Sequence, residues 1–103
     1  MSELRSGKDC AKGKLALKIP MTVTNRLGLH ARAAAKFVET AGQFDADITV
    51  RKDDNEVSGL SIMGLMMLAA TPGTEIVIES MGNQAEDALA ALKDLVARNF
   101  DEN

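Results

Sequence analysis

The sequence predicts an α+β fold in which one layer of helices covers one face of a mostly antiparallel, four-stranded sheet. Three observations predict it. Four short segments alternate apolar and polar residues, and three others carry apolar residues at helical spacing. The seven segments follow one another as β-α-β-β-α-β-α, so that two neighbouring strands can form a hairpin. Helices that are apolar on one side, combined with half-apolar strands, favour a two-layer arrangement.

A change in the spacing of apolar residues along the chain predicts the first strand and the first helix. Apolar residues at every second position from Leu17 to Val23 indicate a strand with one buried face. Because Pro20 cannot donate a hydrogen bond to a neighbouring strand, we expect this strand at an edge of the sheet. From Ala31 to Ala41 the apolar residues follow the i, i+3, i+4, i+7 rule of an amphipathic helix, and Gly42 is expected to end it as the C′ residue.

A hairpin and a short helix are predicted next. The alternation around Ile48 predicts the second strand, the polar run KDDNE a turn, and residues 57–60 the third strand. The segment SIMGLMMLAA predicts a short second helix with Ser61 as its N-cap. The residues of this helix expected to face the core are Ile62, Leu65 and Ala69.

A turn, a strand and a third helix complete the prediction. In TPGT, Pro72 and Gly73 fit the two central positions of a type II turn, and TEIVIES predicts the fourth strand. Asn83 and Glu86 have the spacing of a capping box at the start of the last helix. Its apolar positions are Ala85, Ala88, Leu89, Leu92, Val96 and Phe100.

The size and charge of the chain indicate a single domain and argue against nucleic-acid binding. A chain of 103 residues with 46% hydrophobic residues supports one domain. Residues 1–20 contain five basic and two acidic groups, whereas residues 21–103 contain seven basic and thirteen acidic groups. Because the body is acidic and contains no Trp or Tyr, it lacks the basic stripe and the stacking platforms of a nucleic-acid-binding protein.

The N-terminal segment is polar and rich in Gly and Lys. It predicts a loose basic arm over residues 1–16, ahead of a folded domain at residues 17–103, with weak electrostatic contact to an acidic partner as the alternative. The single cysteine, Cys10, cannot form an intramolecular disulfide. No apolar run is long enough to cross a membrane, and the segment lacks the apolar centre of a signal peptide. We therefore expect a cytoplasmic protein.

The only histidine, His30, stands where the first helix is predicted to begin, a position at which Ser, Thr, Asp or Asn is the usual cap. A helix N-terminus presents unpaired N–H groups and a positive dipole, which attract phosphate. Arg32 adds a permanent charge suited to phosphoryl oxygens, and an imidazole offers a nucleophilic nitrogen. With Gly28 allowing a tight bend, these residues describe a covalent phosphoryl acceptor.

Each of these residues also has a plain structural interpretation. A lone His at a loop–helix junction can be a solvated or capping residue, Arg32 an exposed helix residue and Gly28 a turn residue. A small hydrolase with His30 as general base is disfavoured, because the motif offers no Ser, Cys or carboxylate partner.

The segment GLHARAAAKFV resembles the active-centre signature of the HPr family, the small histidine phosphocarriers of the bacterial phosphotransferase system. In that signature Gly-Leu-His is followed by a small residue, Arg and usually Pro-Ala. SIMGLMMLAA looks like the family's second-helix segment, and PGTEIVI looks like its following turn and last strand. The resemblance runs from about Leu17 to the C-terminus. It implies an open-faced β-sandwich, with three helices on one face of four strands.

The resemblance implies that His30 carries the phosphoryl group on Nδ1, receiving it from phospho-enzyme I and passing it to a histidine of an EIIA-type protein. Arg32 would steady the phosphate, together with the backbone N–H groups of Ala31, Arg32 and Ala33. Such a protein is a carrier and not a free-standing kinase; it needs no metal and no organic cofactor, and we expect a monomer. Ala33 stands where most members have Pro, which removes a pre-set backbone angle and adds an N–H donor.

The second helix predicts a docking surface. A short helix that is apolar on nearly all sides must dock against something in a small two-layer domain, and Met repacks easily against successive partners. The resemblance implies that enzyme I and the downstream acceptor dock there. The predicted partner-binding residues are Ile62, Met63, Met66 and Met67. Core filling is the alternative, above all for Met67.

Ser61 and Ala33 bear on regulation. Ser61 matches the serine that a dedicated kinase phosphorylates in some members, a change that would add negative charge beside the docking face. Ala33 and SIMGLMMLAA look similar to phosphocarriers of the nitrogen-related branch, whose terminal acceptor is a regulatory EIIA protein. The sugar-transport branch is one alternative. A non-transferring regulatory module controlled at Ser61 is another, although relatives of that kind lack the active-centre histidine.

Overall fold

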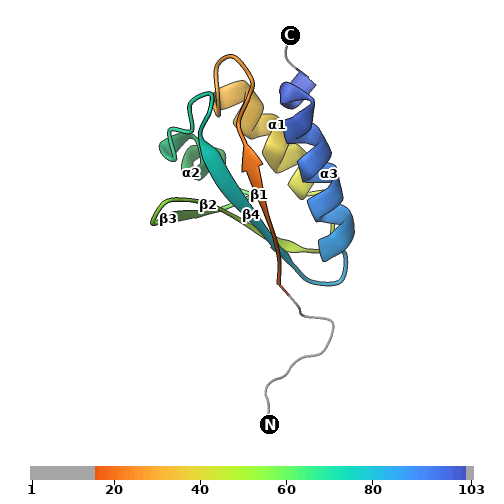
Figure 1. Cartoon of the computed structure of the whole chain (residues 1–103). Helices are drawn as coiled ribbons and strands as arrows, with labels where there is room; N and C mark the ends of the chain where they lie inside the picture. Colours follow the sequence, from red (N-terminus) through yellow and green to blue (C-terminus); the bar gives the residue numbers. More distant parts are fainter. Residues whose placement is uncertain (1–15, 102–103) are drawn as a thin grey trace.

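The computed structural model describes residues 16–101, and the strands and helices follow the predicted order. The elements are β1 (Leu17–Thr22), α1 (Ala31–Ala41), β2 (Asp47–Lys52), β3 (Asn55–Ser58), α2 (Ile62–Met67), β4 (Glu75–Met81) and α3 (Ala85–Ala97) (Figure 1). The predicted N-terminal arm lies outside the described residues except for Ala16, as does Cys10. None of the described helices has the length and apolar character needed to cross a membrane.

The four strands form one antiparallel sheet in the order β1-β4-β2-β3. The edge position predicted for the Pro20 strand is confirmed, and so is the β2–β3 hairpin. The predicted range of the third strand, residues 57–60, is wrong: Lys52 already pairs with Asn55, because Asp53 adopts a left-handed backbone (φ 55°) and closes a short turn. Residues 59 and 60 instead lead the chain into α2.

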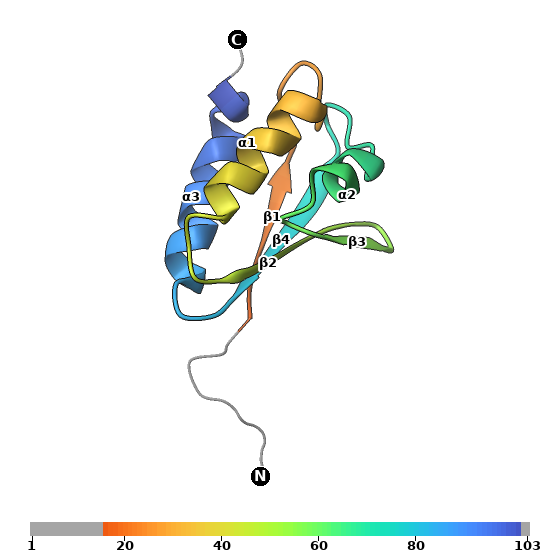
Figure 2. The same ribbon diagram turned by 180° about the vertical axis from the view of Figure 1, so that it is seen from behind.

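The three helices cover one face of the sheet and leave the other open (Figure 2). Successive residues along β2 and β4 alternate between buried positions on the covered face and more exposed positions on the open face, as the sequence pattern requires. The largest apolar side chains that the two layers bury completely are Phe37, Phe100, Leu65, Ile76, Ile78, Leu92, Val23, Val50 and Val96. The two-layer prediction is therefore confirmed.

Two predicted helix caps are wrong in detail, although α1 ends at Ala41 as expected. Gly42 follows α1 with a right-handed backbone (φ −71°), because the chain continues into a further turn in which Gln43 N–H donates to Thr40 O. The capping box predicted for α3 does not form. Asn83 Nδ2 donates instead to an Asp45 carboxylate oxygen (2.8 Å), and Gln84, whose side chain accepts from the Asp45 N–H (2.7 Å), precedes the helix.

The second helix is capped as predicted but turned differently from the prediction. Ser61 Oγ accepts a hydrogen bond of 2.9 Å from the Gly64 N–H. Leu65 is buried, but Ile62 is 40% exposed and Ala69 is exposed, so these two predicted core residues are wrong. For Ala69 the reason is that α2 ends at Met67 and Ala69 adopts a left-handed backbone (φ 53°), which takes its side chain off the helical face.

Leu68 and Ala70 occupy the core beside Leu65 in place of the two residues predicted there. The type II turn that follows is confirmed. Gly73 has φ 91°, and the N–H of Thr74 donates to Thr71 O at 3.0 Å.

Candidate functional site

His30 occupies the N-cap position of α1, and its imidazole acts as the cap. Its backbone is extended (φ −89°, ψ −177°), and Nδ1 accepts a hydrogen bond of 3.3 Å from the backbone N–H of Arg32. The ring is half-buried, so it is neither enclosed in the core nor fully in solvent. The capping interpretation is therefore correct, and it places the Nδ1 lone pair at the positive end of the helix.

The first turn of α1 supplies backbone donors around this nitrogen. The first hydrogen bond along the helix runs from Ala34 N–H to His30 O (2.8 Å), so the N–H groups of Ala31, Arg32 and Ala33 precede it and lie at the helix end. This turn contains no Asp or Glu to oppose the dipole. The Arg32 side chain is exposed, whereas Ala33 is fully buried against the core. The arrangement is suited to an anion bound at Nδ1.

The loop before His30 is held by a buried asparagine that the sequence reasoning missed. Asn25 is 1% exposed, and its Nδ2 donates to Gly28 O at 2.8 Å. The same carbonyl oxygen accepts from the His30 N–H at 2.9 Å, while Gly28 N–H donates back to Asn25 O at 3.2 Å. An Asn three residues before a turn Gly was the available signal, since Asn side chains bond to nearby backbone in turns.

Gly28 is required by close contact with the segment after α2. Its φ is +66°, and a Cβ atom there would lie 2.3 Å from the Ala70 carbonyl oxygen. The neighbouring Leu29 N–H donates to that oxygen at 2.9 Å. The turn role predicted for Gly28 is thus confirmed, and the loop carrying His30 rests directly on residues that follow the second helix.

A depression beside His30 is lined by four charged side chains. It is lined by Arg26, Arg32 and Lys36, with Phe100 and Asp101 contributed by the far end of the chain. Lys36 Nζ lies 3.5 Å from Asp101 Oδ2. Sequence reasoning missed Asp101 because it is 65 residues away from Lys36, and no local pattern joins them. Lys36 carried a signal, since it lies four residues after Arg32 on one helical face.

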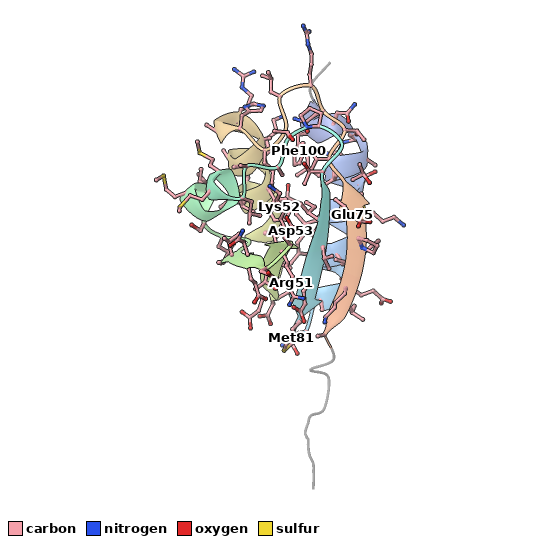
Figure 3. All side chains as sticks on the ribbon, turned by 60° about the vertical axis from the view of Figure 1, so that its left-hand side comes forward. Arg51, Lys52, Asp53, Glu75, Met81 and Phe100 are labelled. Atoms are coloured by element: carbon pink, nitrogen blue, oxygen red, sulfur yellow. The ribbon has the colours of Figure 1, made fainter. Side chains whose placement is uncertain are left out.

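An apolar surface extends over α2 near this depression. Its exposed residues, which we call the apolar surface, are Leu27, Leu60, Ile62, Met63, Met66 and Met67. Met63 is 70% and Met67 78% exposed, so core filling does not account for them. Leu27 lines the depression itself, and α2 packs against α1, the helix that His30 caps. Figure 3 shows sulfur atoms on the outer side of α2. Leu27 and Leu60 were missed in the sequence because isolated loop leucines have no periodicity.

Comparison with known proteins agrees with the resemblance seen in the sequence. The family model described as PTS HPr component phosphorylation site matches residues 17–98. Phosphocarrier protein HPr of Neisseria meningitidis serogroup A is 50% identical over 86 residues, which are 84% of this chain and 97% of that protein. Phosphocarrier protein NPr of Shewanella violacea is 42% identical over 86 residues, 84% of this chain and 94% of that protein.

Solved structures agree as well. The crystal structure of HPr-C-His from Thermoanaerobacter tengcongensis superimposes with a TM-score of 0.81 at 39% identity, covering 84% of this chain and 98% of that one.

Proposed function

Since the chain belongs to the HPr family of phosphotransferase-system phosphocarriers, we propose that His30 is its phosphoryl acceptor. In this proposal Nδ1 takes the group from phospho-enzyme I and gives it to a histidine of an EIIA-type protein. The phosphocarrier domain spans residues 17–103 and works as a cytoplasmic monomer. The observation that carries the proposal is the hydrogen bond from the Arg32 N–H to His30 Nδ1 at the N-terminus of α1.

The transfer itself exchanges one N–P bond for another. Nδ1 of His30 attacks the phosphorus atom of the donor phosphohistidine, the new N–P bond forms, and the donor's ring nitrogen leaves with the electron pair of the broken bond. In its hydrogen bond with the Arg32 N–H, Nδ1 is the acceptor, which is the role of the ring nitrogen that can attack phosphorus. At 3.3 Å this hydrogen bond is longer than the usual 2.9–3.0 Å, so little is lost when it is released.

The helix end then serves the transferred group. The Arg32 N–H that faced Nδ1 becomes a donor to a phosphoryl oxygen, joined by the N–H groups of Ala31 and Ala33 at the same end. The exposed Arg32 guanidinium can close over two further oxygens. These donors are fixed by the helix before transfer, so they stabilise the developing charge without reorganising.

A labelling experiment tests the acceptor. The protein is incubated with phosphoenolpyruvate and enzyme I, and the product is assayed for acid-labile, alkali-stable phosphate. His30→Ala is expected to abolish the label while its circular dichroism matches the wild type. Because His30 is the only histidine, ¹⁵N-histidine NMR gives one pair of ring signals, and the nitrogen that couples to phosphorus identifies Nδ1. Label retained by His30→Ala would overturn the proposal.

We further propose that partners dock on the apolar surface. Its residues are largely exposed, adjoin the depression at Leu27 and include methionines that can repack against different faces. Enzyme I and the EIIA-type acceptor must each bring a histidine to His30, so they must use overlapping surfaces in turn. The exposure of this surface supports a carrier that docks successive partners.

For the acceptor we propose a regulatory EIIA protein of the nitrogen-related branch. Ala33 and the methionine-rich α2 support this choice, and the similarity to a protein named NPr is consistent with it. The sugar-transport branch is the alternative, and relatives of higher identity carry the name HPr. The phosphorylated protein is mixed with each class of EIIA, and faster transfer to a sugar-specific EIIA would overturn the assignment.

Ser61 is proposed as a regulatory phosphorylation site. Its Oγ caps α2, and the next two residues, Ile62 and Met63, belong to the apolar surface. A phosphoryl group on Ser61 would stay near the helix N-terminus, but it would place roughly two negative charges beside the apolar surface. Ser61→Asp is expected to slow transfer from enzyme I, and Ser61→Asn, which keeps a capping side chain without the charge, serves as its control. Equal rates for the two variants would contradict the regulatory role.

A further inference from the structure

We propose that Lys36 is a second phosphoryl-binding cation of this site, paired with Asp101 until His30 is phosphorylated. The inference rests on the proposed function and names a residue beyond His30 and Arg32 for the same reaction. Lys36 lines the depression that contains both of those residues, and it stands one helical turn after Arg32 on α1.

The pairing between Lys36 and Asp101 is loose enough to exchange. Lys36 Nζ is 3.5 Å from Asp101 Oδ2, and the two side chains are 37% and 47% exposed. An exposed ion pair at this distance contributes little, and a lysine ammonium on its flexible stem can change partner. A phosphoryl group on Nδ1 would bring more negative charge than one carboxylate into the same depression.

Asp101 keeps another partner when Lys36 leaves. Its other oxygen, Oδ1, accepts a hydrogen bond of 2.9 Å from Arg98 Nε, and Arg98 in turn pairs with Asp94. This hydrogen bond from Arg98 is the main cause that lowers the pKa of Asp101. The exchange therefore leaves the Asp101 carboxylate paired with Arg98, and Lys36 replaces a carboxylate partner with a phosphoryl group of greater negative charge.

The position of Asp101 is set by the turn that carries it. Asn99, Phe100 and Asp101 have left-handed backbones with φ of 58°, 55° and 63°. Phe100 is fully buried, and Asn99 Oδ1 accepts a hydrogen bond from Thr24 Oγ1 in the loop before α1. A left-handed backbone is unfavourable for Phe, so its burial and the Thr24 contact hold the turn in place. Asp101 is thereby held among the residues that line the depression.

The test compares four single variants, and the double variant Lys36→Met/Asp101→Asn, as phosphorylated proteins. Lys36→Met removes the cation, Lys36→Arg keeps the charge, and Asp101→Asn removes the competing carboxylate. Lys93→Met, on α3 and outside the lining of the depression, is the matched control. Each protein is phosphorylated with enzyme I and phosphoenolpyruvate, the phosphorylated fraction at equilibrium is measured, and the second ionisation of the phosphoryl group is followed by ³¹P NMR.

The expected effects of Lys36 and Asp101 have opposite signs. Lys36→Met should lower the equilibrium constant for phosphorylation by about two- to fivefold, the range that an exposed ion pair provides, and should raise the second pKa of the phosphoryl group. Asp101→Asn should shift both quantities the other way. The double variant should match Lys36→Met, because Asp101 acts through Lys36. Lys36→Arg, which keeps the charge, should recover most of what Lys36→Met loses, and Lys93→Met should match the wild type.

The remaining outcomes overturn the proposal. If Lys36→Met titrates in the ³¹P experiment like Lys93→Met, Lys36 does not touch the phosphoryl group. If it only slows transfer from enzyme I, it contacts the partner instead. In both cases a labelled His30 leaves the proposed function standing. A wild-type protein that takes up no phosphoryl group would remove the proposed function and this inference together.

Discussion

The backbone N–H of Leu29 donates a hydrogen bond of 2.9 Å to the carbonyl oxygen of Ala70, which joins the loop carrying His30 to the segment that follows α2. Gly28 packs against the same oxygen. The candidate acceptor and the apolar surface are therefore parts of one packed unit. A partner that docked on α2 would find His30 in a fixed relation to that helix, as the proposed transfer between two histidines requires.

Gly28→Ala is predicted to destabilise the fold and to slow phosphoryl transfer. The new Cβ would meet Ala70 O at 2.3 Å, and the left-handed backbone (φ +66°) is itself unfavourable for Ala. Gly73→Ala is the matched control, because Gly73 also has a positive φ (+91°) but nothing lies within 4 Å of its Cβ position. Urea denaturation should show a loss of about 1 kcal/mol for Gly73→Ala and roughly 2–4 kcal/mol for Gly28→Ala. Equal losses would mean that contact with Ala70 does not constrain the loop.

Asn25→Ala is predicted to lower both stability and the rate of transfer. It removes the buried hydrogen bond to Gly28 O, the oxygen that also holds the His30 N–H, at a cost of about 1–3 kcal/mol. Ser80→Ala is the control. Ser80 is also buried and donates to Ala85 O at 2.9 Å, but it lies on β4 next to the start of α3.

Both variants should lose similar stability in urea denaturation. Only Asn25→Ala should slow phosphorylation by enzyme I, because only that variant frees the loop before His30. A matching decrease in Ser80→Ala would show that general destabilisation explains the effect.

Met67→Glu is predicted to weaken docking without affecting the fold. Met67 is 78% exposed, so the substitution should change the free energy of unfolding by no more than about 0.5 kcal/mol. A charge in the apolar surface should raise the KM of enzyme I for this protein several-fold. Met81→Glu is the control, since Met81 is also exposed but lies at the opposite end of the sheet from Phe100 (Figure 3). An unchanged KM for Met67→Glu would remove α2 from the docking surface.

The layers, and the placement of His30 and Arg32 at the start of α1, could be predicted from sequence because they depend on local patterns. Period-two and helical spacing gave the order of elements, Pro20 gave the sheet edge, and Ser61 gave the cap of α2. The position of His30 beside Arg32 followed from the helix start alone. Each of these features is decided within a few residues of chain.

What could not be predicted depends on contacts between distant segments. Asn83 has a capping-box spacing, yet it bonds to Asp45, 38 residues earlier. Ala69 fits the helical spacing of apolar residues, yet it has a left-handed backbone and lies beyond the end of α2. Lys36 and Asp101 meet only because the last turn folds back onto α1. Tertiary packing decides the structure at these positions, and the local spacing of residues does not predict it.

Stability is predicted to depend on acid titration of Asp101. The hydrogen bond from Arg98, then the charges of Arg98 and Lys36, lower the pKa of Asp101 below its ordinary value. A carboxyl whose pKa is lower in the folded protein stabilises the fold above its unfolded pKa, and this contribution is lost as the pH falls through the lowered value. Asp101→Asn should therefore lower the urea midpoint relative to the wild type, and this loss should be larger at neutral pH than in acid.

Comparing the wild type with Asp101→Asn at several pH values separates the electrostatic contribution of Asp101 from the effect of its left-handed backbone. Asn tolerates the left-handed backbone at position 101 (φ 63°), and that preference does not change with pH. The difference in urea midpoint between the wild type and Asp101→Asn should therefore shrink steadily as the pH is lowered from neutral. It should be smallest at pH values below the range in which carboxyl groups titrate. Added salt should shrink the same difference at neutral pH, because exposed ion pairs are screened. A difference independent of both pH and salt would mean that Asp101 holds the turn through its backbone alone.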